Sequence, residues 1–410
     1  MNPPRPLLSF VWKSKAGLQT CLEKIQTRSL PRPLCISDTR PLLAMVSGGV
    51  ITIPRMTPKE RAYATLEHRE PDRVPLLEAW TSTIVIEKVL HRPFGGVCDF
   101  IYFYRTLEID FVPVSSSGWQ YRPVEQNVVM DEWGRKWQQK EGSLFGELGF
   151  YIDGTLKTPE KFDEFQFPSP LAPGRLDTFE AALKAVGDEY AVAGTLEEAI
   201  FEHAALQVGL RDFLSYMYKE PSFAHKVLKK HYEFSLELAK SFLDAGAEFI
   251  LIGDDLADNH GPFMSPRLYK DFIHPYYKSL VQSLKKRGAK VIFHSDGNLI
   301  PIITDILDWG IDGLHPIQPG AMDILQFKRD YGDKIAIVGG VDVARLLPFG
   351  SEEDVVQAVV DVIKAVSPGG GYVLGSSNSL HSYVPDIDKY VRNVRTYIET
   401  AHKFGVYPIQ

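Results

Sequence analysis

The feature of this chain that most limits its fold is a regular alternation of short apolar runs and helix-like segments in its C-terminal half. The apolar runs predict strands over residues 248–254, 290–294, 311–315, 334–339 and 371–376. Helices are predicted over residues 265–287, 299–309, 321–331, 351–366 and 385–403. The strands are continuously apolar, as expected where helices cover both faces of a sheet. The alternation therefore predicts parallel strands joined by crossover helices.

The N-terminal half follows the same pattern less regularly. Thr57 and Glu60 form a capping box with a proline in the first turn, which predicts a helix to about His68. Further strands are predicted over residues 74–78, 111–115 and 190–195, and helical segments over about 207–245. Residues 119–154 are rich in Trp, Tyr, Val and Gly and predict a β-hairpin insertion after the second strand. The total of eight strands predicts the α/β class and a (β/α)8 TIM barrel.

Composition agrees with this fold and excludes other classes. The chain has 410 residues, of which 44% are hydrophobic and 24% charged, and one barrel of roughly 250 residues or more with insertions accounts for most of it. No apolar run approaches the roughly 18 residues of a membrane span. A net charge of −7 gives no basic footprint for nucleic acid. Cys21, Cys35 and Cys98 show neither metal-like spacing nor a disulfide framework, so we expect a reducing compartment and a cytoplasmic protein.

Residues 1–55 have a different composition from the rest of the chain. They contain eight Lys or Arg against Glu23 and Asp38. A basic leader that is poor in acids is typical of an organelle transit peptide. The alternative is that translation starts at Met56 or Met45, and we favour it because Met56 directly precedes the capping box. We therefore expect residues 1–55 to be a leader outside the folded or native chain, and residues 56–410 to form the barrel domain.

One strand end carries residues suited to catalysis. The predicted strand 290–294 ends in His294, and Asp296 follows shortly before the next helix. Catalytic residues of barrel enzymes lie at the carboxyl ends of the strands. Because the two residues are two apart, their side chains share a face and can converge on one ion or one substrate atom. The alternative is a buried structural histidine bonded to a backbone carbonyl.

Several motifs follow one another in a consistent order over roughly residues 56–404. They lie at residues 56–61, 70–75, 253–255, 264–269, 294–298, 310–318 and 338–342. Together they resemble the uroporphyrinogen decarboxylase superfamily. This resemblance implies one of two activities: decarboxylation of uroporphyrinogen, or methyl transfer that involves a corrinoid protein and a zinc-activated acceptor thiol.

The decarboxylase branch implies arginines just after the first strand, because the eight carboxylates of its substrate need bidentate partners. Residues 77–82 occupy that position here and contain no arginine. Arg69 and Arg73 precede the strand, so we expect them at the opposite end of the barrel. This departure argues against a true uroporphyrinogen decarboxylase.

The methyltransferase branch implies a zinc site of the form His-x-Cys with a distant second Cys. His294 matches, but Asp296 stands in place of the first Cys, and residues 375–379 contain no thiol where the second is expected. Any metal ligands must then be nitrogen and oxygen atoms. We expect a divalent metal, zinc or a harder cation, bound by His294, Asp296 and a carboxylate. The candidates for that carboxylate are Glu78, which is our choice, Asp254 and Asp255.

The remaining candidate residues also lie at strand ends. Asp254, Asp255 and His294 are the candidate catalytic residues; the adjacent aspartates point opposite ways, so one faces the site while the other caps or pairs structurally. Substrate contacts are expected from Trp80, His315, Gln318, Asp342 and Asn378. Packing is an equal alternative for His315, and a turn is the alternative for Asp342, because glycines precede it.

Three functions follow from these observations. The leading hypothesis is a methyltransferase that moves a methyl group between a small methylated substrate and a corrinoid carried on a partner protein, with metal assistance. The second is a decarboxylase in which Asp254 or Asp255 stabilises positive charge on a porphyrinogen ring. The third is a non-catalytic barrel that binds a tetrapyrrole or a partner protein. We expect no nucleic acid or membrane partner, and pairing through outer helices or loops is compatible with a homodimer.

Overall fold

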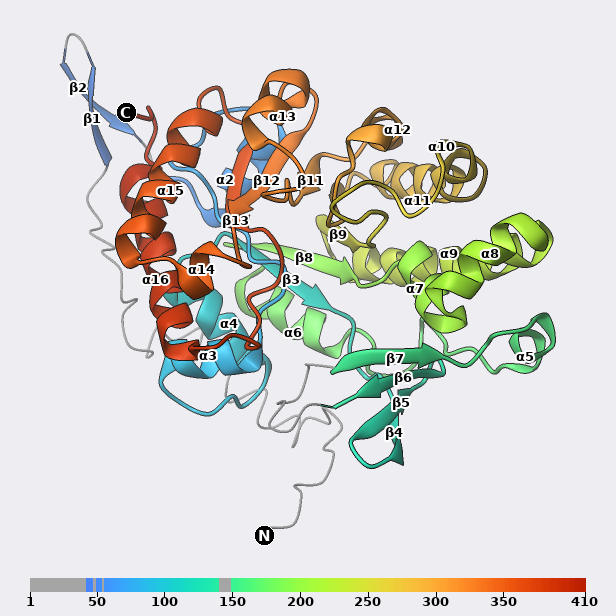
Figure 1. Ribbon diagram of the computed structural model, residues 1–410. Coiled ribbons are helices and arrows are strands. Elements are labelled where there is room, and N and C mark those ends of the chain that lie inside the picture. The colour runs from blue at the N-terminus through green and yellow to red at the C-terminus, as the bar shows by residue number, and fades with distance from the viewer. Residues whose placement is uncertain (1–41, 47–48, 54, 140–148) are drawn as a thin grey trace.

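The central element of the fold is a curved parallel sheet with helices packed around it (Figure 1). The computed structural model describes residues 42–46, 49–53, 55–139 and 149–410. Seven strands form the sheet in the order β13 (Tyr372–Ser376), β12 (Ala336–Val341), β11 (Gly313–His315), β10 (Lys290–His294), β9 (Phe249–Gly253), β8 (Ala191–Leu196) and β3 (Phe111–Ser115). Neighbouring strands are all parallel. The alternation in the sequence therefore predicted the α/β class and the strand direction correctly.

The helices of the described residues connect and flank these strands. They are α2 (Pro58–Leu66), α3 (Thr83–Leu90), α4 (Val97–Thr106), α5 (Pro159–Glu164), α6 (Asp177–Val186), α7 (Phe201–Val208), α8 (Leu210–Lys219), α9 (Pro221–Asp244), α10 (Pro266–Leu268), α11 (His274–Lys285), α12 (Ile303–Trp309), α13 (Ile324–Tyr331), α14 (Leu346–Phe349), α15 (Glu352–Val366) and α16 (Ile387–Phe404). The long helix predicted over residues 265–287 is divided, because the π-helical turn Tyr269–Ile273 separates α10 from α11. Pro275 in the first turn of α11 lacks an N–H, which favours this interruption.

Residues 74–78, predicted as the first strand, do not form a regular strand of the sheet. Leu76 forms an isolated parallel bridge to Leu374 of β13. Its carbonyl also accepts hydrogen bonds from the N–H groups of Asp110 and Phe111, at 3.1 and 3.2 Å, at the start of β3. This segment thus contacts both edges of the sheet, but its ladder is too short to count as an eighth strand.

A second sheet follows β3. It is antiparallel and contains β4 (Tyr121–Glu125), β5 (Val128–Asp131), β6 (Arg135–Gln138) and β7 (Phe150–Gly154). The sequence predicted a hairpin here, whereas the segment forms four strands. The carboxylate of Asp131 accepts hydrogen bonds from the N–H of Trp133 (3.0 Å), the Nε of Arg135 (2.6 Å) and the Nε1 of Trp137 (2.9 Å). This buried aspartate therefore fixes the orientation of the Arg135 and Trp137 side chains in the antiparallel sheet.

The amino ends of the parallel strands are closed by a buried ionic network. Arg61 of α2 contacts Asp72 at 2.5 Å and Asp110 at 2.9 Å. Arg73 contacts the second oxygen of Asp110 at 2.8 Å. His294 ends β10 and therefore lies at the opposite end of the sheet. These arginines thus neutralise buried carboxylates that are far from His294. Arg73 thus lies at the amino ends of the strands, as predicted from its position before residues 74–78.

The capping box of α2 forms as predicted. The side chain of Thr57 accepts a hydrogen bond from Glu60 N at 3.2 Å, and Thr57 N donates to the Glu60 carboxylate at 2.7 Å. We expect Thr57→Ala to reduce the free energy of unfolding by about 1 kcal/mol, because the first turn loses one of its acceptors. Urea denaturation of both proteins measures this difference. An unchanged unfolding midpoint would show that the cap does not stabilise α2.

Three further predictions concern the rest of the chain. The leader predicted over residues 1–55 lies largely outside the described residues, although β1 (Leu42–Val46) and β2 (Gly49–Ile53) pair antiparallel within it. Among the helices of the described part, none is long and apolar enough to cross a membrane. The expected reducing compartment and cytoplasmic location stay predictions.

Candidate metal centre

Three side chains with metal-ligand chemistry meet at the carboxyl ends of β9 and β10, a region that we call the mouth. His294 ends β10, Asp296 follows it, and Asp255 follows β9. One potential ligand atom of each residue lies within 4.8 Å of the other two. A nitrogen and two carboxylates at this spacing suit a divalent cation. The structure thus brings the predicted pair together and adds Asp255 to it.

A chain of hydrogen bonds determines which nitrogen of His294 faces this group. His315 Nε2 lies 3.1 Å from the carbonyl oxygen of Ser376, and His315 Nδ1 lies 2.6 Å from His294 Nδ1. Because a carbonyl only accepts, His315 carries its proton on Nε2, and its Nδ1 then accepts from His294 Nδ1. The remaining nitrogen of His294, Nε2, therefore presents a lone pair 3.7 Å from Asp255 Oδ1.

The two aspartates also present acceptors to the same space. Asp255 Oδ1 accepts from the backbone N–H of Asp296 at 2.8 Å. Asp296 Oδ2 accepts from the side-chain amide of Asn378. Its other oxygen, Oδ1, is buried and has no hydrogen-bond partner among the described residues. A buried acceptor without a partner raises the free energy of the folded state, and so do acceptors that face one another. A bound cation would contact the oxygen that has no partner and would offset the repulsion between the facing acceptors. This set of ligand atoms therefore fits a metal ion.

Burial shifts the protonation of all three groups. Burial and the charge of Asp255 raise the pKa of Asp296 to about 8, against a hydrogen bond from Asn378 that lowers it. Burial raises the pKa of Asp255. Burial also lowers the pKa of His294 to about 3, so its imidazole is neutral, which is the form that binds metals. A bound cation would reverse the carboxylate shifts by favouring the charged forms.

The predicted substrate contact Trp80 lies directly beside this centre. Its ring packs edge-on against His294, with 4.6 Å between ring centroids. Its Nε1 donates to Glu197 Oε1 at 2.9 Å. Gly253 at the end of β9 makes room for the indole, because a Cβ there would lie 3.0 Å from a Trp80 ring carbon. Trp80 therefore forms one wall of the mouth.

Glu78, the carboxylate chosen from the sequence as the third metal ligand, does not join the group. It is fully buried and accepts hydrogen bonds from Ser376 N at 3.0 Å, Ser376 Oγ at 2.5 Å and the Tyr397 hydroxyl. Burial raises its pKa to about 7 against these hydrogen bonds. Its carboxylate oxygens are thus occupied, and Asp255 replaces Glu78 in the candidate metal set.

Asp254, a candidate catalytic residue, caps a helix instead. Its carboxylate accepts from the backbone N–H groups of Ile200, Phe201 (2.9 Å) and Glu202 (2.6 Å) at the start of α7, and from the Tyr277 hydroxyl. It has no exposed surface. Of the adjacent aspartates, Asp255 therefore faces the mouth and Asp254 is structural, which is the division expected from their opposite directions.

The other predicted substrate contacts have mostly structural partners. His315 is fully buried behind His294 and orients it. Gln318 accepts from Gly297 N at 2.6 Å and thereby holds the loop after β10. Asp342 accepts from two backbone N–H groups of its own turn, at 2.8 and 3.0 Å, in agreement with the turn alternative. Asn378 remains at the mouth through its bond to Asp296.

Sequence reasoning missed three charged residues around the mouth. Glu202 of α7 accepts from Asp255 N at 3.3 Å, and burial together with the charge of Asp255 raises its pKa well above the usual range. Glu197 directly follows β8, so the strand-end rule that selected His294 could have found it. Arg135 comes from the second sheet and pairs with Asp131 at 2.6 Å. No strand-end pattern points to Arg135.

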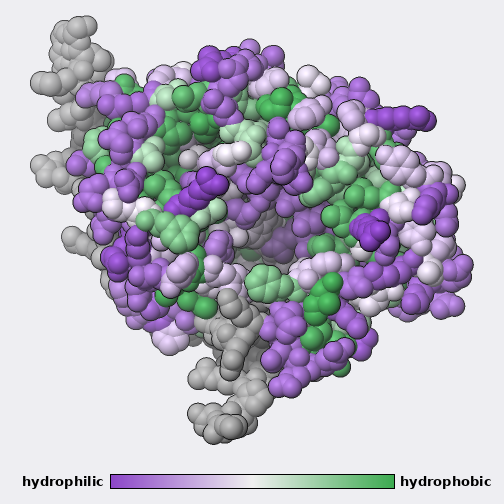
Figure 2. Space-filling view, viewed as in Figure 1, coloured by the Kyte–Doolittle hydropathy of each residue, from purple (hydrophilic) through white to green (hydrophobic). Residues whose placement is uncertain are grey.

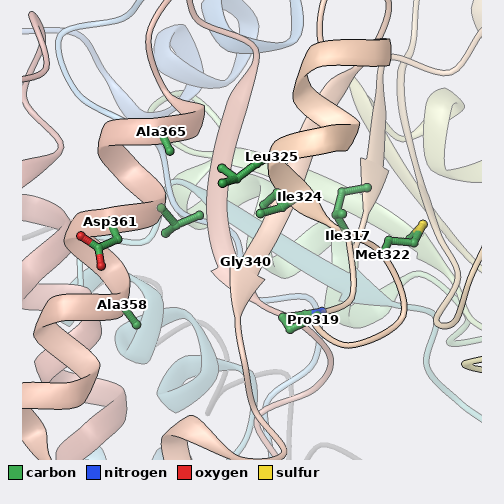
Figure 3. A pocket seen from close by; sticks show the side chains of 10 residues that line it. Ile317, Pro319, Met322, Ile324, Leu325, Gly340, Ala358, Asp361 and Ala365 are labelled. Atoms are coloured by element: carbon green, nitrogen blue, oxygen red, sulfur yellow. The ribbon is translucent and has the colours of Figure 1, made fainter.

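One cavity formed by described residues lies away from this chemistry. It has a volume of about 390 Å³ and lies between α13, α15 and the loop after β11 (Figure 3). Its lining is Ile317, Pro319, Met322, Ile324, Leu325, Gly340, Ala358, Asp361, Val362 and Ala365. The lining is almost entirely apolar and includes none of the candidate metal ligands, so we do not assign the reaction to it.

Comparisons with known proteins agree with this fold. Residues 147–404 match the family model described as uroporphyrinogen decarboxylase (URO-D). Uroporphyrinogen decarboxylase of Coxiella burnetii (strain Dugway 5J108-111) is 26% identical over 200 residues, which cover 46% of this chain and 50% of that protein. The enzyme of Chlorobium limicola (strain DSM 245 / NBRC 103803 / 6330) is 29% identical over 178 residues, 42% of this chain and 47% of that protein. The chain spans about half the length of these curated relatives.

One solved structure matches over most of the chain. It is a methyltransferase from Methanosarcina mazei, with a TM-score of 0.65 and 19% sequence identity. The match covers 85% of this chain and 99% of that one. At this identity the likeness shows a shared fold and does not identify the reaction.

Proposed function

The chain belongs to the uroporphyrinogen decarboxylase family, and from this premise we propose that it is an enzyme that transfers a methyl group from a small methylated compound. The proposed reaction uses a divalent cation, most simply zinc, held by Asp255, His294 and Asp296. We also propose that the curved sheet closes into a (β/α)8 barrel through residues 74–78, which hydrogen-bond to both sheet edges.

The observation that carries the proposal is the set of acceptors that face one another at the mouth. His294 Nε2 lies 3.7 Å from Asp255 Oδ1, and Asp296 Oδ1 is buried without a partner among the described residues. A hydrogen bond from His294 to His315 and one from Asn378 to Asp296 hold two of these ligands in place. Partners of this kind orient metal ligands and set their tautomers.

The chemistry follows from this arrangement. When bound, the cation would polarise the heteroatom that bears the methyl group. The carbon–heteroatom bond then breaks with its electrons remaining on the heteroatom, and the methyl carbon bonds to the acceptor nucleophile. We propose a corrinoid carried by a partner protein as that acceptor. Trp80 shields one side of the reacting group, and His315 keeps His294 Nε2 unprotonated.

The alternative is a decarboxylase of uroporphyrinogen type, which the names of the curated relatives favour. Such a substrate carries many carboxylates and needs cationic partners. Arg61 and Arg73 are instead paired with buried aspartates at the amino ends of the strands. Asp254, which the sequence offered for charge stabilisation, caps α7. These contacts make decarboxylation the second choice.

A direct comparison of the two reactions tests the proposal. The full chain is incubated with cob(I)alamin and a panel of methylated ethers, amines and thioethers, and methylcobalamin is followed by absorbance. In parallel, uroporphyrinogen is supplied and coproporphyrinogen is measured by chromatography. We expect methylcobalamin with at least one donor and no coproporphyrinogen. Coproporphyrinogen formation without any methyl transfer would establish the alternative instead.

A further inference from the structure

Glu197 is an exposed residue that contacts Trp80 beside the metal centre. It directly follows β8, and Ser115 ends the neighbouring strand β3. The arrowheads of these two strands end near the centre of Figure 1, where the surface in Figure 2 is hollowed and lined by hydrophilic residues. The side chain of Glu197 is exposed, yet the surrounding protein raises the pKa of its carboxyl. Both properties are expected of a carboxylate on the wall of a deep hollow.

The contacts of Glu197 leave one of its oxygens available. Trp80 Nε1 donates to Oε1 at 2.9 Å, and Ser115 Oγ donates to the same atom at 2.5 Å. Among the described residues, no hydrogen bond to Oε2 is formed. A carboxylate beside a partly exposed aromatic ring suits the binding of an organic ammonium group.

The ionisable groups around the hollow are mostly carboxyl groups. Glu202, Asp255 and Asp296 are carboxylates of the same mouth. The guanidinium of Arg135 is already paired with two carboxylates, Asp131 at 2.6 Å and Glu198. A surface rich in carboxyl groups and without an unpaired arginine among the described residues named here favours a cationic ligand over an anionic one.

A second, independent feature indicates a polar occupant next to Glu197. A cavity of about 20 Å³, large enough for one water molecule, is lined by Glu197, Ser116 and His203 among others. His203 is only 4% exposed, and its Nε2 has no hydrogen-bond partner among the described residues. A buried nitrogen without a partner that lines a cavity implies a polar group or water in that cavity.

We propose that Trp80 and Glu197 form a binding site for the cationic end of the substrate, an amine or a methylated ammonium group. That this ligand is the substrate rests on the proposed methyl transfer, whereas the binding itself does not. The indole of Trp80 contacts Glu197 through Nε1 and His294 through its ring. A small molecule can therefore occupy this site and reach the metal centre on the other side of one indole.

Calorimetric titration of the full chain with choline tests this site. The matched probe is 3,3-dimethyl-1-butanol, which has the same shape without the charge. We expect choline to bind, the alcohol to bind at least about tenfold more weakly, and Glu197→Gln to weaken choline binding by about tenfold or more. Glu353→Gln, which changes an exposed carboxylate on α15, is the control and should bind choline as the wild type does.

Three results would overturn the inference: no choline binding to the wild type, equal binding of choline and the alcohol, or unchanged binding by Glu197→Gln. The metal content of the same samples separates this inference from the proposed function. A chain that binds choline through Glu197 but contains no metal would support the cation site and contradict metal-assisted transfer. A chain that contains metal but does not bind choline would contradict the cation site and support metal-assisted transfer.

Discussion

Replacing Asp254 with alanine is expected to lower the free energy of unfolding by at least about 3 kcal/mol. The carboxylate accepts three backbone N–H groups at the start of α7 and the Tyr277 hydroxyl, and none of its surface is exposed. Its removal leaves these buried donors without acceptors, and each such loss costs about 1–3 kcal/mol. Urea denaturation followed by circular dichroism measures the difference.

The adjacent residue provides the matched control. Asp255 has a side chain that is 35% exposed and lies next to other carboxylates. In the metal-free chain, Asp255→Ala is therefore expected to change the free energy of unfolding by less than about 1 kcal/mol, because it removes a repulsive charge along with one hydrogen bond. Equal destabilisation by both variants would contradict the division of roles between the two aspartates.

Replacing His294 with alanine is expected to reduce kcat/KM for methyl transfer by about 10³-fold or more. Loss of this ligand removes the cation, and Lewis-acid stabilisation is worth several kcal/mol. Steady-state rates with a fixed donor and cob(I)alamin measure the effect. His315→Ala is the matched comparison, because His315 touches the metal centre only through His294. A smaller loss of about 10- to 100-fold is expected for it.

Near-wild-type turnover by His294→Ala would show that the reaction does not pass through this centre. A second outcome is also informative: equal losses in His294→Ala and His315→Ala would mean that the two histidines act as one unit. Circular dichroism spectra of both variants show whether the fold is retained, since both side chains are buried.

The parallel strands and one pair of site residues could be predicted from the sequence because they depend on local pattern. The predicted strand 290–294 coincides with β10, and the predicted helix 351–366 lies within one residue of α15, which has its own capping box at Ser351. Strand direction then delivers His294 and Asp296 to one end of the sheet. These features need only periodicity, caps and the alternation of strands and helices.

The remaining features depend on contacts between distant segments. The choice of Asp255 over Glu78 as the third ligand depends on Ser376 and Tyr397, far along the chain, which occupy the Glu78 carboxylate. Arg135 reaches the mouth from a second sheet. Helix α3 has the sequence TIVIEKVL, whose β-branched residues do not indicate a helix. Tertiary packing overrides such local preferences.

The most direct test of the central claim is the metal content of the full chain after dialysis, measured by inductively coupled plasma mass spectrometry beside Asp296→Ala. Asp296 supplies the buried oxygen that has no partner among the described residues. The account predicts about one divalent cation per chain in the wild type and almost none in the variant. A wild-type chain without metal, or equal metal in both proteins, would contradict it.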